Sequence, residues 1–433
     1  MSNFPNWLDN DLAHNLLAQV AVESNNDNQN ENNNVVESEN GYFVYHLDKL
    51  KQHLTKLQQQ DVVKLWYAVK ANPLSDIIHT LDQQRFNFDV ASVGELNQVL
   101  AQDIMPQRIL NTGPAKSKKQ LQYFLQQGVN TFVVESLNQL KWLNECAVSL
   151  NKQPTVLLRV QLQWPDGEKN PLGGNSLTPF GLATQEWLQI NLADYAALNI
   201  CGLHIFQWGN MLSNEKMYAL WSQMVPPLIE LATQLKMDLK ILDLGGGLGL
   251  DYVGQSLKQH AQQHGKQIQT LSWQQIINDL AVIKANAGVA ELWLELGRYA
   301  VGECGYYVTE VIDKKTNFGE QQLVLAAGIN HIIRPAITEQ AFPVTTLRAT
   351  PQTTLENYHL HGPLCTSLDK LGHVSLTSDI AVGESLIFGY CGAYGFSESM
   401  PFFLCHNIAA EYIFENGTLK QVRSAQVASE YLR

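Results

Sequence analysis

The sequence predicts an α/β protein in which a (β/α)8 barrel of the TIM type is followed by a mostly antiparallel β domain. Three observations indicate this fold. Eight short apolar strand candidates alternate with helical patterns between residues 65 and 296. Polar or glycine residues follow these strands at the same end, where barrels of this kind collect functional groups. After about Tyr299 no long helical pattern separates the strand candidates, which is typical of a separate β region.

The barrel strands are predicted at short runs of aliphatic and aromatic residues bounded by turn residues. Nearly every position in these runs is apolar, which indicates a parallel sheet covered on both faces. An open doubly wound sheet is the alternative, but eight consecutive units favour a closed barrel. The predicted strands are 65–69, 88–91, 108–111, 131–134, 156–160, 201–206, 240–244 and 292–296.

Helices are predicted before the first of these strands and between them, where apolar residues recur with the helical period. Their predicted ranges are 47–60, 74–83, 94–102, 117–127, 137–150, 184–196, 215–235 and 273–287. In the C-terminal region, strands are predicted at 306–313, 322–327, 344–349, 357–361, 384–388 and 411–414.

The N-terminal region carries one amphipathic segment at 8–22 and then a stretch rich in Asn, Glu and Ser at 23–41. That stretch cannot bury enough apolar surface to offset the entropy of ordering, so we expect it to be flexible. The predicted organisation is an N-terminal helix and Asn-rich segment at 1–41, a cofactor-binding barrel at 42–298 and a β domain at 299–433. We expect the strand near 42–46 to join the β domain.

Composition narrows the classes of function. The chain has 433 residues and a net charge of 29 − 41 = −12, and its most biased run is acidic and amide-rich. A nucleic-acid partner is therefore not expected. The six cysteines are scattered without a CxxC pair, which indicates reduced thiols in a cytoplasmic protein and argues against a metal site. No signal peptide or membrane span is predicted.

Lys70 follows the predicted strand 65–69, and a turn begins at Asn72-Pro73. A lysine at the end of an apolar strand is poorly hydrated, which favours the neutral, nucleophilic amine. Such an amine suits a Schiff base with an aldehyde cofactor. The alternative is that Lys70 extends past the strand and keeps its charged end in water.

A phosphorylated cofactor would also need an anion site. Gly245, Gly246 and Gly247 follow the predicted strand 240–244, and without Cβ atoms their N–H groups can approach a phosphate closely. A plain flexible turn is the alternative. Three further residues are candidates to complete the phosphate site: Gly297, Arg298 and Tyr394.

Glu295 ends a very apolar strand, and a buried carboxylate is costly unless its charge is paired. The protonated ring nitrogen of a pyridine cofactor would pair this charge and keep the ring a strong electron sink. A structural ion pair with Arg298 or Arg159 is the alternative. Cys365 lies in a Gly/Pro-containing loop, where a thiol can protonate a carbanion or be a small buried hydrophobic residue.

Taken together, these segments resemble the fold-type III pyridoxal phosphate (PLP) decarboxylases, which include diaminopimelate, ornithine and arginine decarboxylases. The resemblance implies an alanine-racemase-like barrel, a β domain and a homodimer in which the loop carrying Cys365 reaches the partner's active site. It is carried, in the same order along the chain, by YAVKAN at 67–72, DVAS at 89–92, GEL at 94–96, GPAKS at 113–117, GGG at 245–247, E-x-G-R at 295–298, GPLC at 362–365 and GAY at 392–394.

Carried over position by position, the resemblance implies that Lys70 is the Schiff-base lysine, Glu295 the partner of the ring nitrogen, and Cys365 the acid that protonates the decarboxylated carbanion. It also implies that Arg159 lies near the phenolic oxygen of the cofactor and that Asp89 is a further cofactor contact. The implied phosphate site consists of Gly245, Gly246, Gly247, Gly297, Arg298 and Tyr394.

Two departures concern the cofactor. The family usually places a histidine against the cofactor's face, in a segment like His-x-Gly-Ser. The matching stretch here is HIFQWG at 204–209, so Phe206 takes that place. An aromatic ring can still stack but cannot share charge with the cofactor. Glu295 is followed by Leu296 rather than by the common proline.

Other departures concern the substrate. Arg334, in a segment like that of diaminopimelate decarboxylase, suggests a substrate carboxylate, whereas Thr366 replaces the glutamate that such enzymes use for the distal amino group. Asp369 is predicted to bind substrate with them. The combination looks more like specialised members that decarboxylate conjugates, such as citryl-diamino acid intermediates of carboxylate siderophores or carrier-bound amino acids.

The leading hypothesis is a PLP-dependent decarboxylase of such a specialised amino-acid-derived substrate. Diaminopimelate decarboxylase, or another decarboxylase of a free diamino acid, is the nearest alternative. A racemase on the same barrel usually pairs the ring nitrogen with arginine and uses tyrosine as a base, so Glu295 and Cys365 argue against it. A non-catalytic PLP-binding regulator is the alternative of a different class.

Overall fold

The structure, a computed structural model of the whole chain, describes residues 4–27, 41–164, 177–252, 271–348 and 354–433. Its contacts divide the chain into two compact units. The unit that we call the barrel unit contains residues 53–250 and 269–300, and the unit that we call the sheet unit contains residues 1–52, 251–268 and 301–433. The helices α2 and α11 each cross a boundary between these ranges.

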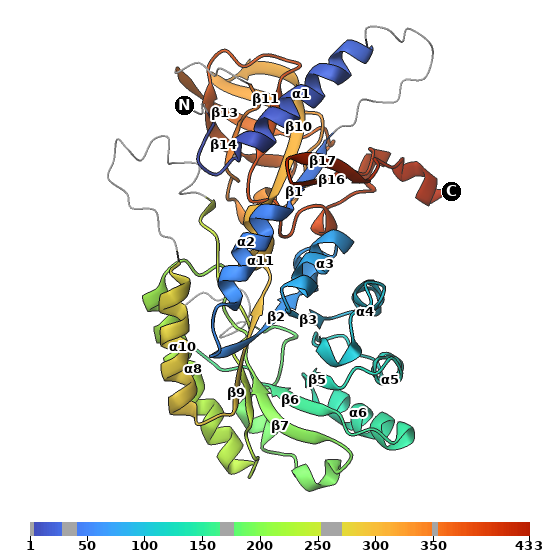
Figure 1. Cartoon of the computed structure of the whole chain (residues 1–433), viewed down its shortest axis with the longest axis vertical. Coiled ribbons are helices and arrows are strands. Elements are labelled where there is room, and N and C mark those ends of the chain that lie inside the picture. The colour runs from blue at the N-terminus through green and yellow to red at the C-terminus, as the bar shows by residue number, and fades with distance from the viewer. Residues whose placement is uncertain (1–3, 28–40, 165–176, 253–270, 349–353) are drawn as a thin grey trace. The chain divides into compact units, whose positions relative to one another are not determined.

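The barrel unit contains a closed barrel of eight parallel strands, as predicted (Figure 1). Each strand pairs with the next in sequence, and the last pairs with the first. Each of the eight predicted barrel strands is present, and its ends lie within two residues of the predicted ends. The strands are β2 (Val63–Ala68), β3 (Asn87–Val90), β4 (Ile109–Asn111), β5 (Thr131–Val134), β6 (Thr155–Arg159), β7 (Asn199–His204), β8 (Ile241–Asp243) and β9 (Glu291–Leu296).

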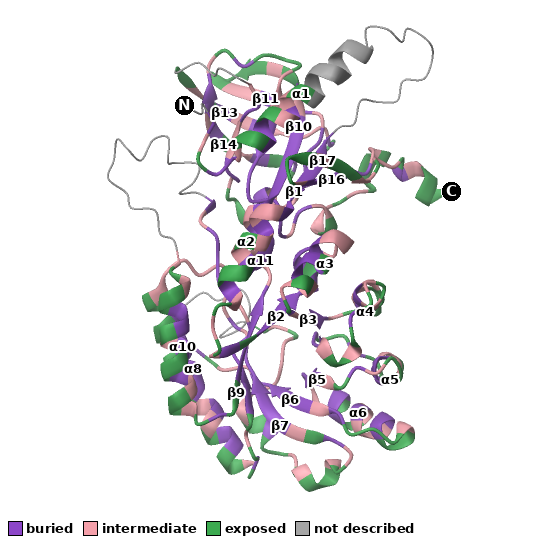
Figure 2. Cartoon of the chain, viewed as in Figure 1, coloured by how far each residue is buried: buried purple, intermediate pink, exposed green. Residues whose placement is uncertain are grey.

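The strands are buried while the helices around them expose one face (Figure 2). A cluster of buried side chains from seven strands contributes to the barrel core, and in it the rings of Trp66 and Trp293 lie 4.8 Å apart. Burial of such large rings is among the main stabilising contributions to a fold. The barrel strands therefore form a rigid support for the residues at their ends.

Serines begin many of the surrounding helices, with their hydroxyls accepting a hydrogen bond from the N–H three residues on, which stabilises the first turn. The helices are α2 (Leu47–Gln58), α3 (Ser75–Gln83), α4 (Val93–Leu100), α5 (Lys118–Gln126), α6 (Leu137–Leu150), α7 (Thr184–Trp187), α8 (Asn214–Gln234), α10 (Trp273–Ala287) and α11 (Arg298–Val301).

The single helix predicted at 184–196 is wrong. The segment contains the short α7 and then a separate 3-10 turn at Leu192–Tyr195. The side chain of Asn191 accepts a hydrogen bond from the N–H of Ala193, and such a local bond competes with continuation of a helix.

The sheet unit contains a mixed, mostly antiparallel sheet in the order β14-β13-β11-β10-β1-β16-β17, with β15 pairing to β10 and β12. Two of its pairs, β1 with β16 and β11 with β13, are parallel. We did not predict β14 or β17. The strands are β1 (Tyr42–His46), β10 (Gly305–Asn317), β11 (Glu320–Leu325), β12 (Val344–Thr346), β13 (Leu355–His361), β14 (Lys370–Thr377), β15 (Ser385–Phe388), β16 (Ala410–Glu415) and β17 (Thr418–Arg423).

Two further helices belong to the sheet unit, α12 (Arg334–Thr338) and α1 (Asn10–Asp27). The helix α1 includes residues 23–27, which we had assigned to the flexible segment. The sequence there contains no glycine or proline that would end a helix. The rest of the predicted flexible segment, 28–40, lies outside the described residues. No described helix combines the length and apolar character needed to cross a bilayer.

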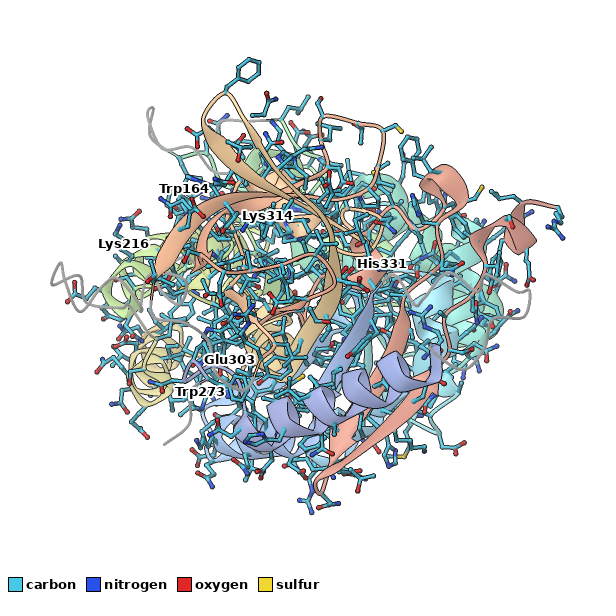
Figure 3. The ribbon with its side chains drawn as sticks, turned by 90° about the horizontal axis from the view of Figure 1, so that it is seen from above. Trp164, Lys216, Trp273, Glu303, Lys314 and His331 are labelled. Atoms are coloured by element: carbon cyan, nitrogen blue, oxygen red, sulfur yellow. The ribbon has the colours of Figure 1, made fainter. Side chains whose placement is uncertain are left out.

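His331, labelled in Figure 3, is a buried polar residue of the sheet unit. Its Nδ1 lies 3.1 Å from the Tyr307 hydroxyl and its Nε2 lies 2.7 Å from the carbonyl oxygen of Asn407. Burial lowers the pKa of His331 to about 4, because a buried imidazolium loses its hydration. The imidazole is therefore a neutral structural element at pH 7.

Candidate active site

The carboxyl ends of the barrel strands carry a group of polar residues. Because all eight strands are parallel, these ends meet at one edge of the barrel, where enzymes of this architecture place their active sites. The residues are Lys70 just after β2, Asp89 in β3, Arg159 in β6, His204 in β7, Asp243 in β8 and Glu295 in β9.

Lys70 lies in a single 3-10 turn, Val69–Ala71, directly after β2. The hydroxyl of Tyr67 donates to the carbonyl oxygen of Asn72 at 2.9 Å and fixes this turn. The Nζ atom of Lys70 lies 5.9 Å from the centre of the Phe206 ring. Lys70 is exposed, so the dehydration that we expected from the apolar strand is not present at the lysine.

Asp89, Asp243 and Glu295 are three buried carboxyl groups of the same barrel end. Burial, and then the charge of Glu295, raises the pKa of Asp89 to about 8 and raises the pKa of Asp243 well above its usual value. Burial also opposes ionisation of Glu295, but His204, Lys70 and Arg159 outweigh it and lower the pKa of Glu295. The negative charge of the cluster is therefore concentrated on Glu295.

His204 is a neighbour of Glu295 to which sequence reasoning gave no role. Its Nε2 lies 3.3 Å from Oε1 of Glu295, but neither atom has a well-aligned hydrogen bond within the described residues. Burial lowers the pKa of His204, and the charge of Glu295 opposes this shift. The sequence did contain a signal for this contact. His204 is a polar residue at the carboxyl end of β7, and Glu295 occupies the corresponding end of β9.

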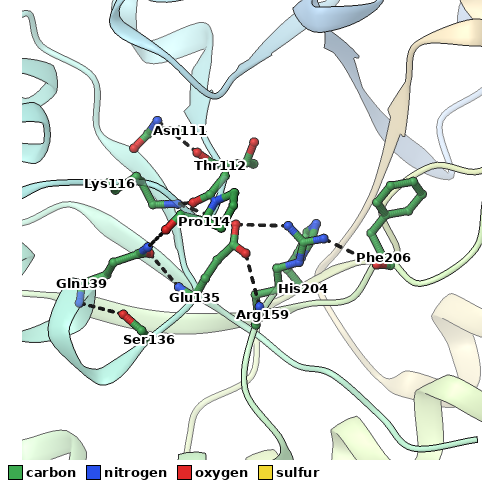
Figure 4. Close-up of polar contacts among 12 residues, drawn as sticks. Asn111, Thr112, Pro114, Lys116, Glu135, Ser136, Gln139, Arg159, His204 and Phe206 are labelled. Carbon is green, nitrogen blue, oxygen red and sulfur yellow. Dashed lines mark hydrogen bonds and ion pairs between the residues drawn. The ribbon is translucent and has the colours of Figure 1, made fainter. Parts of the chain in front are cut away.

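A second group of buried charges surrounds Arg159 (Figure 4). Its Nη1 lies 3.1 Å from Oε1 of Glu135, and the Nζ of Lys116 lies 3.8 Å from the same oxygen. Burial lowers the pKa of Lys116 to about 8. Two cations thus share one carboxylate, and the guanidinium of Arg159 is held in place. Glu135 directly follows the predicted strand 131–134, but sequence reasoning did not pair it with Arg159.

The turn after β8 has the backbone form that we predicted for an anion site. Gly245 and Gly247 have φ angles of 63° and 101°, which favour glycine. A Cβ on Gly246 would lie 2.2 Å from the carbonyl oxygen of Glu295, so this position also requires glycine. Gly246 and Gly247 are half-exposed residues, and their N–H groups donate to no described residue.

Gly297 and Arg298 follow β9 in the barrel unit, and the remaining predicted residues belong to the sheet unit. Arg334 Nη2 lies 2.6 Å from Oε1 of Glu398, and the guanidinium lies 4.6 Å from the centre of the Tyr394 ring. The guanidinium that we predicted to bind a substrate carboxylate therefore already contacts a carboxylate of its own unit. Its Nε atom is buried without a partner among the described residues.

Cys365 and Thr366 lie in the loop between β13 and β14. Cys365 is exposed, so the alternative of a small buried hydrophobic residue is wrong. Asp369 is buried, and its two oxygens accept from the N–H groups of Ile329 and Leu364, each at 2.8 Å. Asp369 therefore ties the loop to the rest of the sheet unit, and its predicted contact with substrate stays a prediction.

These features fit PLP. Accessible N–H groups at a glycine turn suit its phosphate, and the buried Oε1 of Glu295, which lacks an aligned partner among the described residues, suits a protonated ring nitrogen. A primary amine, Lys70, lies at the same barrel end. The fold and the site thus define a barrel enzyme that uses a phosphorylated aldehyde cofactor.

Comparison with known proteins agrees with this assignment of the cofactor. Residues 47–302 match the family described as "Pyridoxal-dependent decarboxylase, pyridoxal binding domain", and the chain belongs to this family. One relative, the 2-[(L-alanin-3-ylcarbamoyl)methyl]-2-hydroxybutanedioate decarboxylase of Staphylococcus aureus, is 28% identical over 388 residues, covering 84% of this chain and 92% of that protein. Diaminopimelate decarboxylase of Aquifex aeolicus is 29% identical over 366 residues, covering 83% of each chain.

Among solved structures, diaminopimelate decarboxylase of Helicobacter pylori complexed with L-lysine has a TM-score of 0.77 and 22% identity, covering 91% of this chain and 96% of that chain. This likeness shows a common fold. The chain is a PLP-dependent decarboxylase, a carboxy-lyase. The predicted fold, cofactor and class of enzyme are confirmed. The alternative of a non-catalytic relative is not supported.

Proposed function

We propose that this decarboxylase acts on an amino-acid unit that is already joined to a citrate-like acid. The observation that carries the proposal is Thr366, which places a neutral hydroxyl beside Cys365 where a decarboxylase of a free diamino acid is expected to carry a glutamate. That hydroxyl accepts a hydrogen bond from the N–H of Leu368 at 3.2 Å. A distal amine that is bound in an amide carries no charge, so it needs no carboxylate partner.

The name of the Staphylococcus aureus relative supports this substrate class, because its substrate joins an alanine unit through a carbamoyl group to hydroxybutanedioate. Such a substrate is rich in carboxylates. Arg334 is proposed to bind one of them, exchanging part of its contact with Glu398 for the substrate.

In the barrel unit, Lys70 is proposed to hold the cofactor and Glu295 to pair with its ring nitrogen. Phe206 is proposed to lie against the ring, and Arg159 and Asp89 near its polar substituents. When bound, PLP supplies an electron sink for the charge left on the α-carbon after the carboxylate leaves. The proposed phosphate contacts are the N–H groups of Gly246, Gly247 and Gly297 and the side chains of Arg298 and Tyr394. Gly245, whose own N–H donates to Asp243, is proposed to shape the turn that presents them.

Cys365 is proposed to deliver the proton that replaces the lost carboxylate. Its exposure suits a group that serves a homodimer, in which the loop of one subunit completes the site of its partner. Phe402 and Leu404 of the same unit are also exposed, at 45% and 47%, and exposed apolar side chains of this kind suit a subunit interface.

The dimer has its own test. If Lys70 and Cys365 of one site come from different subunits, mixing inactive Lys70→Ala and Cys365→Ala variants, with exchange of subunits, restores part of the CO2 release. No recovery, although mass spectrometry shows mixed dimers, would contradict the shared site. We also propose a cytoplasmic location, because all six cysteines are free thiols.

The substrate proposal is tested by CO2 release from the PLP-loaded enzyme with meso-diaminopimelate, lysine, ornithine, arginine and a citryl-linked diamino acid. We expect turnover of the conjugate alone. Turnover of meso-diaminopimelate alone would contradict the proposal and support the diaminopimelate alternative.

A matched variant sharpens the substrate test. Thr366→Glu introduces the carboxylate that a free distal amine requires, so it should lower turnover of the conjugate and raise turnover of meso-diaminopimelate. The control is Thr366→Ser, which keeps the hydroxyl and should preserve the preference of the wild type. Equal substrate specificity in Thr366→Glu and Thr366→Ser would show that the side chain at position 366 does not determine which substrate is decarboxylated.

A further inference from the structure

Three neighbouring strands of the sheet unit, β11, β13 and β14, present metal-ligand side chains on the face opposite the core. Leu323, Tyr358 and Leu360 are buried, and side chains alternate between the two faces of a strand. The intervening residue His359 therefore points to the other face. His373 pairs directly with His359 across β13 and β14, so their side chains share that face.

Glu320 completes this cluster from β11. In the parallel pair of β11 and β13, Gln322 lies opposite His359, and Glu320 precedes Gln322 by two residues and so lies on the same face. The Oε2 atom of Glu320 is 3.5 Å from Nε2 of His359. We call Glu320, His359 and His373 the outer-face triad.

The outer-face triad brings three metal-ligand side chains close together. The rings of His359 and His373 lie 4.2 Å apart and are inclined by only 10°. One ligand atom from each of the three residues can be chosen so that all three lie within 4.8 Å of one another. Two imidazole nitrogens and a carboxylate oxygen form a donor set that Zn²⁺ accepts, with water completing the tetrahedron.

We propose that the outer-face triad is a binding site for a divalent transition-metal ion of the zinc type. The nitrogen lone pairs of the stacked rings lie in the ring planes and do not point at one centre, so binding requires the rings to turn about their side-chain bonds. His373 is exposed and His359 half-exposed, which leaves room for this rotation. A nearby histidine, His361, has its ring 6.5 Å from that of His359, but it lies opposite the cation Lys370 and is not a ligand. The bound ion links three strands, so it stabilises the folded sheet unit.

This proposal departs from the expectation from the sequence, which argued against a metal site because cysteines and histidines do not cluster along the chain. The ligands are separated by 39 and 14 positions in sequence (359 − 320 and 373 − 359), and pairing of the strands brings them together. The site is independent of the proposed substrate, because none of its residues has a part in decarboxylation.

The test is a calorimetric titration of the PLP-loaded, untagged enzyme with ZnCl2. Cys365 and Cys405 are exposed thiols and themselves bind zinc, so the titration uses a Cys365→Ser/Cys405→Ser background. We expect one bound Zn²⁺ per chain. His359→Gln and His373→Gln should each weaken it at least about tenfold, since even outer-sphere partners of metal ligands cost that much.

The matched control is His79→Gln, which removes an exposed histidine of α3 outside the triad and should leave zinc binding unchanged. A second readout is thermal unfolding, because Zn²⁺ should raise the melting temperature of the wild type but not of His373→Gln. No bound equivalent, or an equivalent that survives both triad variants, would overturn the proposal.

Discussion

The two units of the chain place their polar residues in different ways. In the barrel unit, charged groups are buried at the ends of rigid strands and contact one another, as Glu135 does with Arg159 and Lys116. In the sheet unit, the thiol of Cys365 lies exposed on a loop, and the buried Asp369 serves to hold that loop. Under the proposed roles of these residues, the barrel unit would fix the cofactor in advance and the sheet unit would supply the groups that act on the substrate.

Removing Lys70 should have the largest effect. Lys70→Ala lacks the amine proposed to hold the cofactor, so CO2 release should fall by about 10⁵–10⁶, as when a covalent catalytic residue is lost. Borohydride reduction followed by mass spectrometry should find no PLP attached to the chain. Circular dichroism checks the fold, and Lys70→Arg tests whether positive charge alone suffices. A Lys70→Ala chain that still retains reduced PLP would refute the assignment.

Removing Cys365 should affect turnover but not the cofactor, if the two units divide the work as proposed. Loss of a general acid costs about 10²–10⁴ in rate, so Cys365→Ala should release the normal amine that much more slowly. Its PLP affinity, measured by fluorescence titration, should equal that of the wild type. Unchanged turnover in Cys365→Ala would remove the thiol from the mechanism, and Cys365→Ser shows how far a hydroxyl can replace it.

A pH titration tests the buried imidazole of the sheet unit. The pKa of His331 is about 4 in the folded protein and about 6.5 when unfolded, so the unfolded chain binds the extra proton between these values. Its contribution to stability is present above pH 6.5 and is lost as the pH falls toward 4, by at most about 3 kcal/mol.

Urea unfolding at pH 7 and pH 4.5 measures this loss. The wild type should lose more of its free energy of unfolding than His331→Gln, whose side chain does not titrate. Turnover at pH 7 should depend on His331 only through stability. An identical pH dependence of stability in both proteins would show that His331 is already accessible to protons.

Sequence alone predicted the barrel well, because each strand is a local run of apolar residues that ends in a polar one. It also predicted the glycine turn, because the three glycines that this turn requires are consecutive in the sequence. What it missed depends on contacts between distant segments. The pairing of Glu135 with Arg159 joins β6 to the end of β5, and the proximity of His204 to Glu295 joins β7 to β9.

Prediction from the local sequence pattern also failed where a single residue divides a helix or interrupts a strand. The capping bond of Asn191 divides a predicted helix, and Gly372, at a φ angle of 129°, interrupts the apolar alternation of β14. The exposure of Lys70 was an alternative in the sequence analysis. Sequence could not decide it, because an apolar strand does not fix the surroundings of the residue that follows it.

The smallest predicted effect concerns Asp243, a buried carboxyl group of the barrel unit. Its Oδ1 accepts from the N–H of Gly245 at 2.9 Å, whereas its buried Oδ2 has no hydrogen bond within the described residues. Burial and the charge of Glu295 raise the pKa of Asp243 well above its usual value, which favours the neutral acid. It can then donate a proton to a hydrogen bond with Glu295 while it holds the glycine turn.

Two substitutions test whether the Asp243 carboxyl group is neutral or ionised. Asp243→Asn keeps an acceptor for Gly245 and a donor for Glu295, so the free energy of unfolding of the apoprotein and its PLP affinity should stay close to the wild type. Asp243→Ala removes both groups and should cost about 1–3 kcal/mol. If Asp243→Asn were as damaging as Asp243→Ala, the carboxyl group would have to be ionised. The charge of the barrel end would then not be concentrated on Glu295, and its pairing with a protonated ring nitrogen would lose its electrostatic basis.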